Sequence, residues 1–181
     1  GRHHVTGHAG GAPALVGLVR CDFFSAAFNA LACLIAVYHR DRTGRGQLGE
    51  VAQFEAVFRL SEWTVAAYDR LGLVRQRSGN RHPSFAPGDL YRTRDGQSIA
   101  MMAGDQKSFA RLCRAMGREE LVEDLRFATP ALRVENAEEI EGIVSRWFAD
   151  RDLPEAMEVL VREGVPASPV FSTREIVEDP H

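Results

Sequence analysis

The stretch from Asp22 to Arg40 constrains the fold most, because its apolar residues recur at spacings of three and four. The apolar positions are Phe24, Ala27, Phe28, Leu31, Leu34, Ile35 and Tyr38, with Ser25, Ala26, Ala30, Ala32 and Ala36 among them. This period is that of an α-helix, and the small residues allow close neighbours on more than one side. We therefore expect a long buried helix, followed by a turn rich in arginine and glycine at residues 42–47.

Asp22 stands where this helix is expected to begin. An aspartate at this place is most often an N-cap that accepts hydrogen bonds from backbone N–H groups. The same free N–H groups and the partial positive charge of the helix N-terminus also suit a carboxylate that reacts with a substrate. The residues alone leave both roles open.

Composition limits the classes of protein to which the chain can belong. The chain has 181 residues, 45% of them hydrophobic and 26% charged, with a net charge of −3 and dispersed Lys and Arg, so nothing indicates nucleic-acid binding. It contains no unbroken run of about 18 apolar residues, so no membrane span is expected. Cys21, Cys33 and Cys113 lie far apart without metal-site spacing, and we expect reduced thiols in a cytoplasmic protein.

The remaining pattern predicts short helices and one β-hairpin. Helices are expected at about 53–71, 105–116, 119–125, 136–148, 153–163 and 173–178, with a break at 127–130 and extended segments at 47–51 and 165–170. Asp95-Gly96 lies between alternating segments and predicts a hairpin over 89–102. Residues 1–17 have no periodicity, and residues 74–88 are basic and aperiodic, which predicts a loop that crosses between two lobes.

Two motifs that could suggest a ligand have simpler interpretations. The Arg42–Gly46 turn lacks the Lys-Ser/Thr pair of a phosphate-binding P-loop and is typical of a helix C-terminus with solvated arginines. His3, His4 and His8 lie in an irregular segment without acidic or cysteine partners, so we predict no metal site there.

Four groups of residues, in this order and spacing, resemble the family III CoA-transferases, the CaiB/BaiF group. They are Leu18–Asp22, Tyr38–Gln47, Gly79–Pro83 and Gly164–Val170. The resemblance covers nearly the whole chain and implies an α/β fold, with long helices of a large domain and a smaller α+β lobe that contains the hairpin. It implies a large-domain portion at 1–73, a crossing loop at 74–88, a small domain at 89–165 and a return segment at 166–181.

The resemblance also implies a longer protein. The chain would be its central and small-lobe portion, with a CoA-binding half upstream and a further tail downstream. Relatives form interlaced homodimers. The implied substrates are an acyl-CoA thioester and a carboxylic acid, with no permanently bound cofactor and no metal.

The family's chemistry places the reaction on Asp22. Its carboxylate would attack the thioester carbonyl to give a mixed anhydride and CoA thiolate. The thiolate would return to form an aspartyl-CoA thioester, and an incoming acid would repeat the exchange in reverse. The smaller-lobe motif implies substrate contacts at Gly79, Asn80, His82, Pro83 and Ser84. Formyl-CoA transferases carry a glycine tract where this chain has residues 82–85, so oxalate or formate specificity is not implied.

Two alternatives stay beside the transferase. The α-methylacyl-CoA racemases share the fold and the aspartate, but use it for acid/base chemistry with a histidine that would lie upstream of Gly1. The second alternative is a truncated chain that is inactive or that needs a separate CoA-binding subunit. Phe23, Phe24 and Ala26 replace the small residues, often glycine, that usually follow the aspartate, which predicts a tighter and more apolar pocket and favours the transferase.

Overall fold

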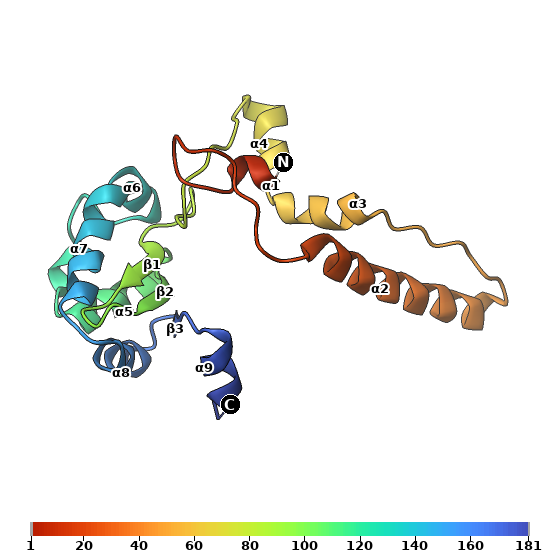
Figure 1. The fold of residues 1–181 in the computed structure, drawn as a ribbon. Helices are drawn as coiled ribbons and strands as arrows, with labels where there is room; N and C mark the ends of the chain where they lie inside the picture. The colour runs from red at the N-terminus through yellow and green to blue at the C-terminus, as the bar shows by residue number, and fades with distance from the viewer. Residues whose placement is uncertain (1, 181) are drawn as a thin grey trace. The chain divides into compact units, whose positions relative to one another are not determined.

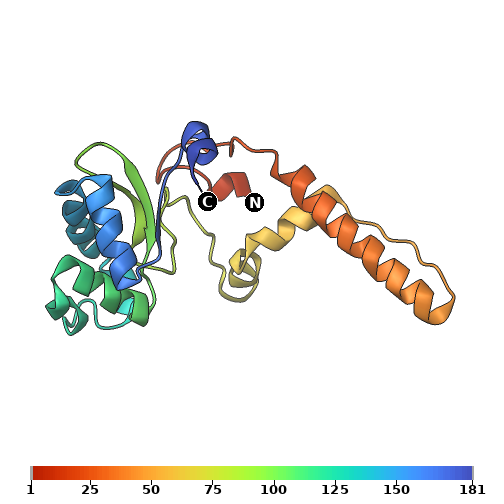
Figure 2. The ribbon, with the colours of Figure 1, turned by 90° about the horizontal axis from the view of Figure 1, so that it is seen from below.

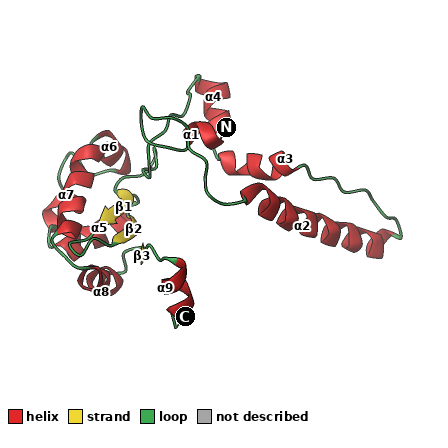
Figure 3. Cartoon of the chain, viewed as in Figure 1, coloured by secondary structure: helices red, strands yellow, loops and turns green. Residues whose placement is uncertain are grey.

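The computed structural model describes residues 2–180. The chain divides into two compact units, Gly1–Gly79 and Asn80–His181. The first unit is helical and the second combines helices with a small antiparallel sheet, as Figure 3 shows by colour. The expectation of a mixed α/β fold is confirmed.

The first unit contains α1 (Arg2–Val5), α2 (Arg20–Thr43), α3 (Gln53–Phe58), the 3-10 helix η1 (Arg59–Ser61) and α4 (Thr64–Leu71). The prediction of one continuous helix at 53–71 is wrong. The helix is interrupted at Glu62, whose φ of 53° is incompatible with an α-helix, and the Thr64 hydroxyl donates a hydrogen bond to the carbonyl of Ser61. The expected strand at 47–51 is also absent, because this segment is a loop without a strand partner in the described part of the unit.

Helix α2 begins two residues earlier and ends three residues later than predicted, and its C-terminus is capped by Gly44 at φ 73°. The expectation that it is buried on more than one side is wrong for this chain. Ser25 is its one buried residue, because the neighbour that packs against it within the unit is the short helix α3. Phe23 and Leu34 are 75% and 67% exposed, so much of its apolar surface is open.

Helix α2 also has the length and average hydropathy, 1.6 over 18 residues, that would allow it to cross a membrane. The search for an unbroken apolar run did not find this helix, because polar residues such as Ser25 and Asn29 interrupt the run. They lower the average hydropathy only slightly. A core helix of a soluble protein meets the same criterion, so the property by itself is weak support for a membrane span.

The second unit contains β1 (Gly88–Arg92), β2 (Ser98–Met102), α5 (Gln106–Met116), η2 (Glu119–Val122), α6 (Pro130–Glu135), α7 (Ala137–Ala149), α8 (Leu153–Glu163), β3 (Ala167–Pro169) and α9 (Thr173–Glu178). The predicted hairpin and the helices at 105–116, 136–148 and 153–163 are confirmed within one or two residues at each end. Helix α6 was not predicted. Thr129 caps its first turn by accepting a hydrogen bond from Leu132 N at 3.2 Å.

The sheet has the strand order β1-β2-β3 and is antiparallel throughout. Helices α5, α7 and α8 lie on one of its faces (Figures 1 and 2). Tyr91, Ile99 and Met101 point to that side and are buried, since alternate residues of a strand face opposite sides. They join a core that includes Phe109, Leu112, Ile140, Val144, Phe148 and Leu160, all fully buried.

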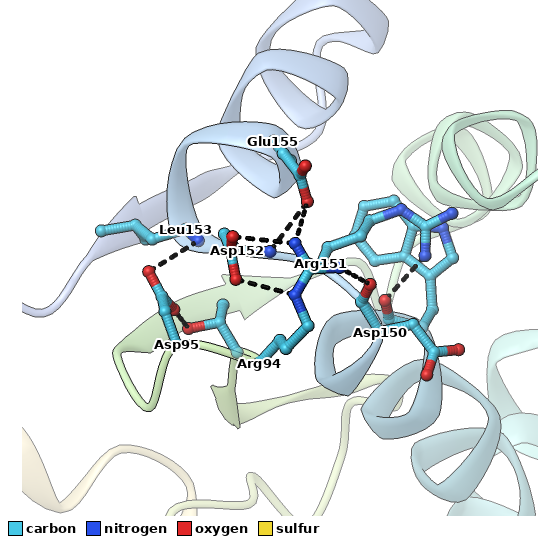
Figure 4. A network of polar contacts seen from close by, with 9 residues as sticks. Arg94, Asp95, Asp150, Arg151, Asp152, Leu153 and Glu155 are labelled. Carbon is cyan, nitrogen blue, oxygen red and sulfur yellow. Dashed lines mark hydrogen bonds and ion pairs between the residues drawn. The ribbon is translucent and has the colours of Figure 1, made fainter.

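The hairpin turn is tied to the start of α8 by a polar network (Figure 4). The Arg94 guanidinium donates to both carboxylate oxygens of Asp152, at 2.9 and 2.8 Å, and to Glu155 at 3.0 Å. Asp95 accepts from Leu153 N at 3.3 Å. These side chains are exposed, so the network adds little free energy, but its two-pronged geometry fixes how the turn meets the helix.

One carboxyl group is buried beneath the sheet. Glu141 on α7 is 3% exposed and accepts hydrogen bonds from Gly88 N, at 2.8 Å, and from the Tyr91 hydroxyl. Burial raises the pKa of the Glu141 carboxyl above its ordinary value of 4.5, although the two donated hydrogen bonds oppose this shift. Burial and the neighbouring carboxylate likewise raise the pKa of Tyr91.

The raised pKa of Glu141 makes the free energy of unfolding depend on pH, and the direction of this dependence follows from the shift. A raised folded-state pKa means that the folded state binds the proton more tightly, so the stabilisation is complete below pH 4.5 and is lost as the pH rises through the raised pKa. We expect wild type to lose stability relative to Glu141→Gln as the pH rises above the ordinary carboxyl pKa of 4.5. Urea unfolding of both proteins at a series of pH values measures the difference. Glu138→Gln, at an exposed position of α7, is the control; a pH-independent difference for Glu141→Gln would contradict the expectation.

Candidate active site

Asp22 lies in the first turn of α2, on the surface of its unit. The N-cap position belongs to Val19, which has no side-chain capping bond, so the interpretation of Asp22 as the N-cap is wrong. The carboxylate therefore does not serve as the cap that its residue type first suggests. It remains close to the helix N-terminus, whose dipole favours negative charge there.

A residue that the sequence did not single out contacts Asp22. The side-chain amide of Gln53, the first residue of α3, donates a hydrogen bond to Asp22 Oδ1 at 2.6 Å. The two residues are 31 positions apart and meet because α3 returns along α2. No local motif signals this pair, since its partners come from different helices. The contact holds the carboxylate in one orientation.

The residues next to Asp22 in the sequence are at least partly exposed. Phe23 is 75% exposed and Phe24 37% exposed, and the neighbouring Cys21 thiol is free and exposed. By contrast, Cys113 lies in the core of the second unit, where burial raises the pKa of its thiol to about 12. A thiol of that kind is unreactive at neutral pH.

The predicted contact Gly79 belongs to the first unit. Its backbone N–H donates to the carbonyl of Gly7 at 2.9 Å, and its φ of 67° is one that glycine adopts without strain. A side chain here would also approach the His8 ring, with its Cβ 3.3 Å from Nδ1. Gly79 therefore fixes the end of this unit rather than offering a reactive group.

The other predicted contacts open the second unit. His82 Nδ1 accepts a hydrogen bond from Ser84 N at 3.2 Å, and the His82 ring lies 4.7 Å from the ring of Phe85. Pro83 and Ser84 are exposed and His82 is half-buried. The structure thus brings His82 and Ser84 together in one turn, with the imidazole oriented by a backbone donor and an aromatic neighbour.

Asn80 lines a groove of 690 Å³ along the face of the sheet that the helices leave uncovered. Leu90 and Met102, 45% and 44% exposed, supply apolar surface there, and Ser168 supplies a hydroxyl. The groove thus combines apolar surface with polar groups from Asn80, Asp89 and Ser168. Among residues 2–180 no cluster of three or more His, Cys, Asp or Glu has the arrangement of a metal site.

Known proteins match the chain along its whole length. The sequence profile of CoA-transferase family III covers residues 1–181. The chain is 33% identical over 177 residues to succinyl-CoA–D-citramalate CoA-transferase of Chloroflexus aurantiacus, and 36% identical over 178 residues to succinyl-CoA:mesaconate CoA-transferase of Haloarcula hispanica. Each match covers 98% of this chain and 44% of the relative.

A solved crystal structure also resembles this chain. The crystal structure of a CaiB/BaiF family protein from Brucella suis superposes with a TM-score of 0.72 at 27% identity, over 99% of this chain and 47% of that one. The chain therefore spans less than half the length of the relatives described here. The profile match over every residue, together with these relatives, shows that the chain belongs to CoA-transferase family III, the CaiB/BaiF family.

Proposed function

We propose that residues 1–181 act within a longer acyl-CoA:carboxylate CoA-transferase, with Asp22 as the nucleophile. The observation that carries the proposal is the Asp22 carboxylate in the first turn of α2, exposed and oriented by the Gln53 amide. A positioned carboxylate that lies open to a ligand can attack an acyl carbon without first losing a buried structural contact.

The reaction follows from the nucleophile. The Asp22 carboxylate attacks the thioester carbonyl of the donor, the C–S bond breaks, and CoA thiolate leaves a mixed anhydride behind. The thiolate then attacks the aspartyl carbonyl and releases the donor acid, which leaves CoA on Asp22. The acceptor carboxylate attacks this thioester and expels the thiolate, which gives a second mixed anhydride between Asp22 and the acceptor. Attack of the thiolate on the acceptor acyl carbon forms the new acyl-CoA and returns the Asp22 carboxylate.

Gln53 has two roles in this sequence. In the resting state its N–H orients the carboxylate, and in the two steps that attack the aspartyl carbonyl the same donor stabilises the oxyanion that forms there. We assign Gly79, Asn80, His82, Pro83 and Ser84 to substrate binding. No permanently bound cofactor is needed, because the CoA thioester is itself the substrate.

The substrates we propose are CoA thioesters and acids of short dicarboxylates. Two relatives carry the names of such reactions, one with D-citramalate and the other with mesaconate, each from succinyl-CoA. We further propose a cytoplasmic homodimer. The free thiols of all three cysteines agree with a reducing compartment, and two Chloroflexus aurantiacus relatives are named as the alpha and beta subunits of a transferase, which supports assembly of more than one chain.

The proposal is tested with a polypeptide of the relatives' full length that contains this chain. Incubation with succinyl-CoA and labelled mesaconate or citramalate is expected to transfer CoA only when the acceptor acid is present. In deuterated water, a 2-methylacyl-CoA is expected to keep its α-hydrogen. Rapid deuterium incorporation without an acceptor would instead identify a racemase, since only that reaction removes the α-proton.

A further inference from the structure

Arg133 on α6 is fully buried in the second unit, at 0% exposure. Its guanidinium donates to the carbonyls of Phe127 at 2.8 Å, Gly104 at 2.8 Å and Ala86 at 3.2 Å, and to the side-chain oxygen of Gln106 at 3.0 Å. Within the described residues it forms no ion pair. A buried charge of this kind is costly, and its hydrogen bonds offset the cost only while every acceptor stays in place.

The four acceptors come from three separate segments. One of these acceptors lies in the loop that carries His82, and another lies against that loop. We call residues 81–88 the His82 loop. Ala86, whose carbonyl Arg133 binds, lies within it. Gly104 lies against the loop, because a Cβ built on Gly104 would be only 2.8 Å from the Cβ of Phe85. Phe85 in turn packs on the His82 ring.

Glu141 binds Gly88, the residue at which this loop passes into β1. It accepts the backbone N–H of Gly88 at 2.8 Å and is itself almost fully buried. Thus a buried guanidinium on α6 binds the carbonyl of Ala86, and a buried carboxyl group on α7 binds the amide of Gly88. Apolar side chains of similar size would fill the core at lower desolvation cost, so packing alone does not account for two charged residues at this place.

We propose that Arg133 and Glu141 are positioning residues that hold the His82 loop, and so the imidazole of His82, in the geometry required for CoA transfer. The proposal rests on the proposed function, which assigns His82 to substrate binding. Loops that contact substrate gain precision when buried hydrogen bonds fix their backbone. Neither charged group touches the substrate; each acts through the loop.

The test combines two substitutions with matched controls in the full-length protein. Arg133→Lys keeps the charge but cannot reach all four acceptors, whereas Arg126→Lys makes the same change at an exposed arginine of the same unit. Gly104→Ala leaves Arg133 intact and displaces Phe85. Gly142→Ala, in α7, is its control, because a Cβ there makes only an ordinary contact of 3.7 Å with the Arg146 side chain.

Two measurements are made without substrate. Hydrogen exchange of the loop amides is expected to accelerate in Arg133→Lys and Gly104→Ala but not in their controls, and the NMR signals of the His82 ring are expected to shift because Phe85 moves. With substrate, kcat is expected to fall between about tenfold and 10²-fold with a smaller change in KM, as for a misplaced contact group. If Arg133→Lys fails to fold, Glu141→Gln carries the test, because its single amide oxygen replaces the two carboxylate oxygens that accept from Gly88 N and the Tyr91 hydroxyl.

The outcomes separate this proposal from the proposed function. Faster exchange and a shifted His82 signal support a positioning role even if the reaction is of another kind. A folded Arg133→Lys or Glu141→Gln protein with unchanged loop exchange, His82 signals and kcat would overturn it, whether or not CoA transfer is observed. A loss of thermal stability with none of these changes would show that the two groups serve the core alone.

Discussion

Asp22→Ala is expected to lower the rate of CoA transfer by at least about 10³-fold, because it removes the carboxyl group on which both proposed covalent intermediates form. Folding is expected to be unaffected, since the side chain is exposed and caps no backbone group. Steady-state transfer from succinyl-CoA to the acceptor acid measures the loss. Addition of acyl-CoA followed by hydroxylamine or borohydride, with mass spectrometry, is expected to find the modification on Asp22 of the wild type.

Two further variants sharpen this result. Asp41→Ala removes an exposed aspartate from the other end of the same helix, where it pairs with Arg40, and is expected to leave the rate unchanged. Gln53→Leu removes the donor at 2.6 Å and is expected to lower kcat by about 10²-fold, as loss of one oxyanion donor does. Full turnover with an unmodified Asp22 would exclude its role as the nucleophile.

Leu160→Ala is expected to reduce the free energy of unfolding by about 2–5 kcal/mol. Leu160 on α8 has no exposed surface and belongs to the core beneath the sheet, so its truncation removes apolar contacts and leaves a cavity. Leu125→Ala makes the same chemical change in the same unit at a side chain that is 85% exposed, and is expected to cost less than about 0.5 kcal/mol.

Urea unfolding followed by tryptophan fluorescence measures both changes, because Trp147 lies in the same core at 8% exposure. The slope of the free energy against urea is expected to be the same for the two variants, so the difference appears in the midpoint. Equal midpoints for Leu160→Ala and Leu125→Ala would contradict the core described here.

The second unit was predictable from sequence because its signals are local. Asp95-Gly96 marks the hairpin, Asp105 caps α5 by accepting from the backbone N–H groups of residues 107 and 108, and Gly164 ends α8 at φ 68°. Helix α6 was missed although Thr129-Pro130 is a common helix start, because Pro130 was interpreted as the end of a segment instead of its first residue.

The first unit was less predictable because its structure depends on neighbours. Apolar spacing identified α2 but not how much of it the chain covers, since periodicity shows which residues share a face and not what covers that face. The interruption at Glu62 has no glycine or proline to mark it. At the candidate site, the sequence pointed to Asp22 and His82 through motifs, whereas Gln53 and Arg133 act through contacts between distant segments.

The uneven distribution of buried residues has an evolutionary consequence. In the described chain the first unit buries only Ser25 and Ala56, while the core lies almost entirely in the second. Substitutions around Asp22 therefore change surface chemistry at little cost in folding free energy, whereas substitutions near the His82 loop disturb buried charges. The unit that carries the His82 loop is accordingly expected to change slowly or together with its core.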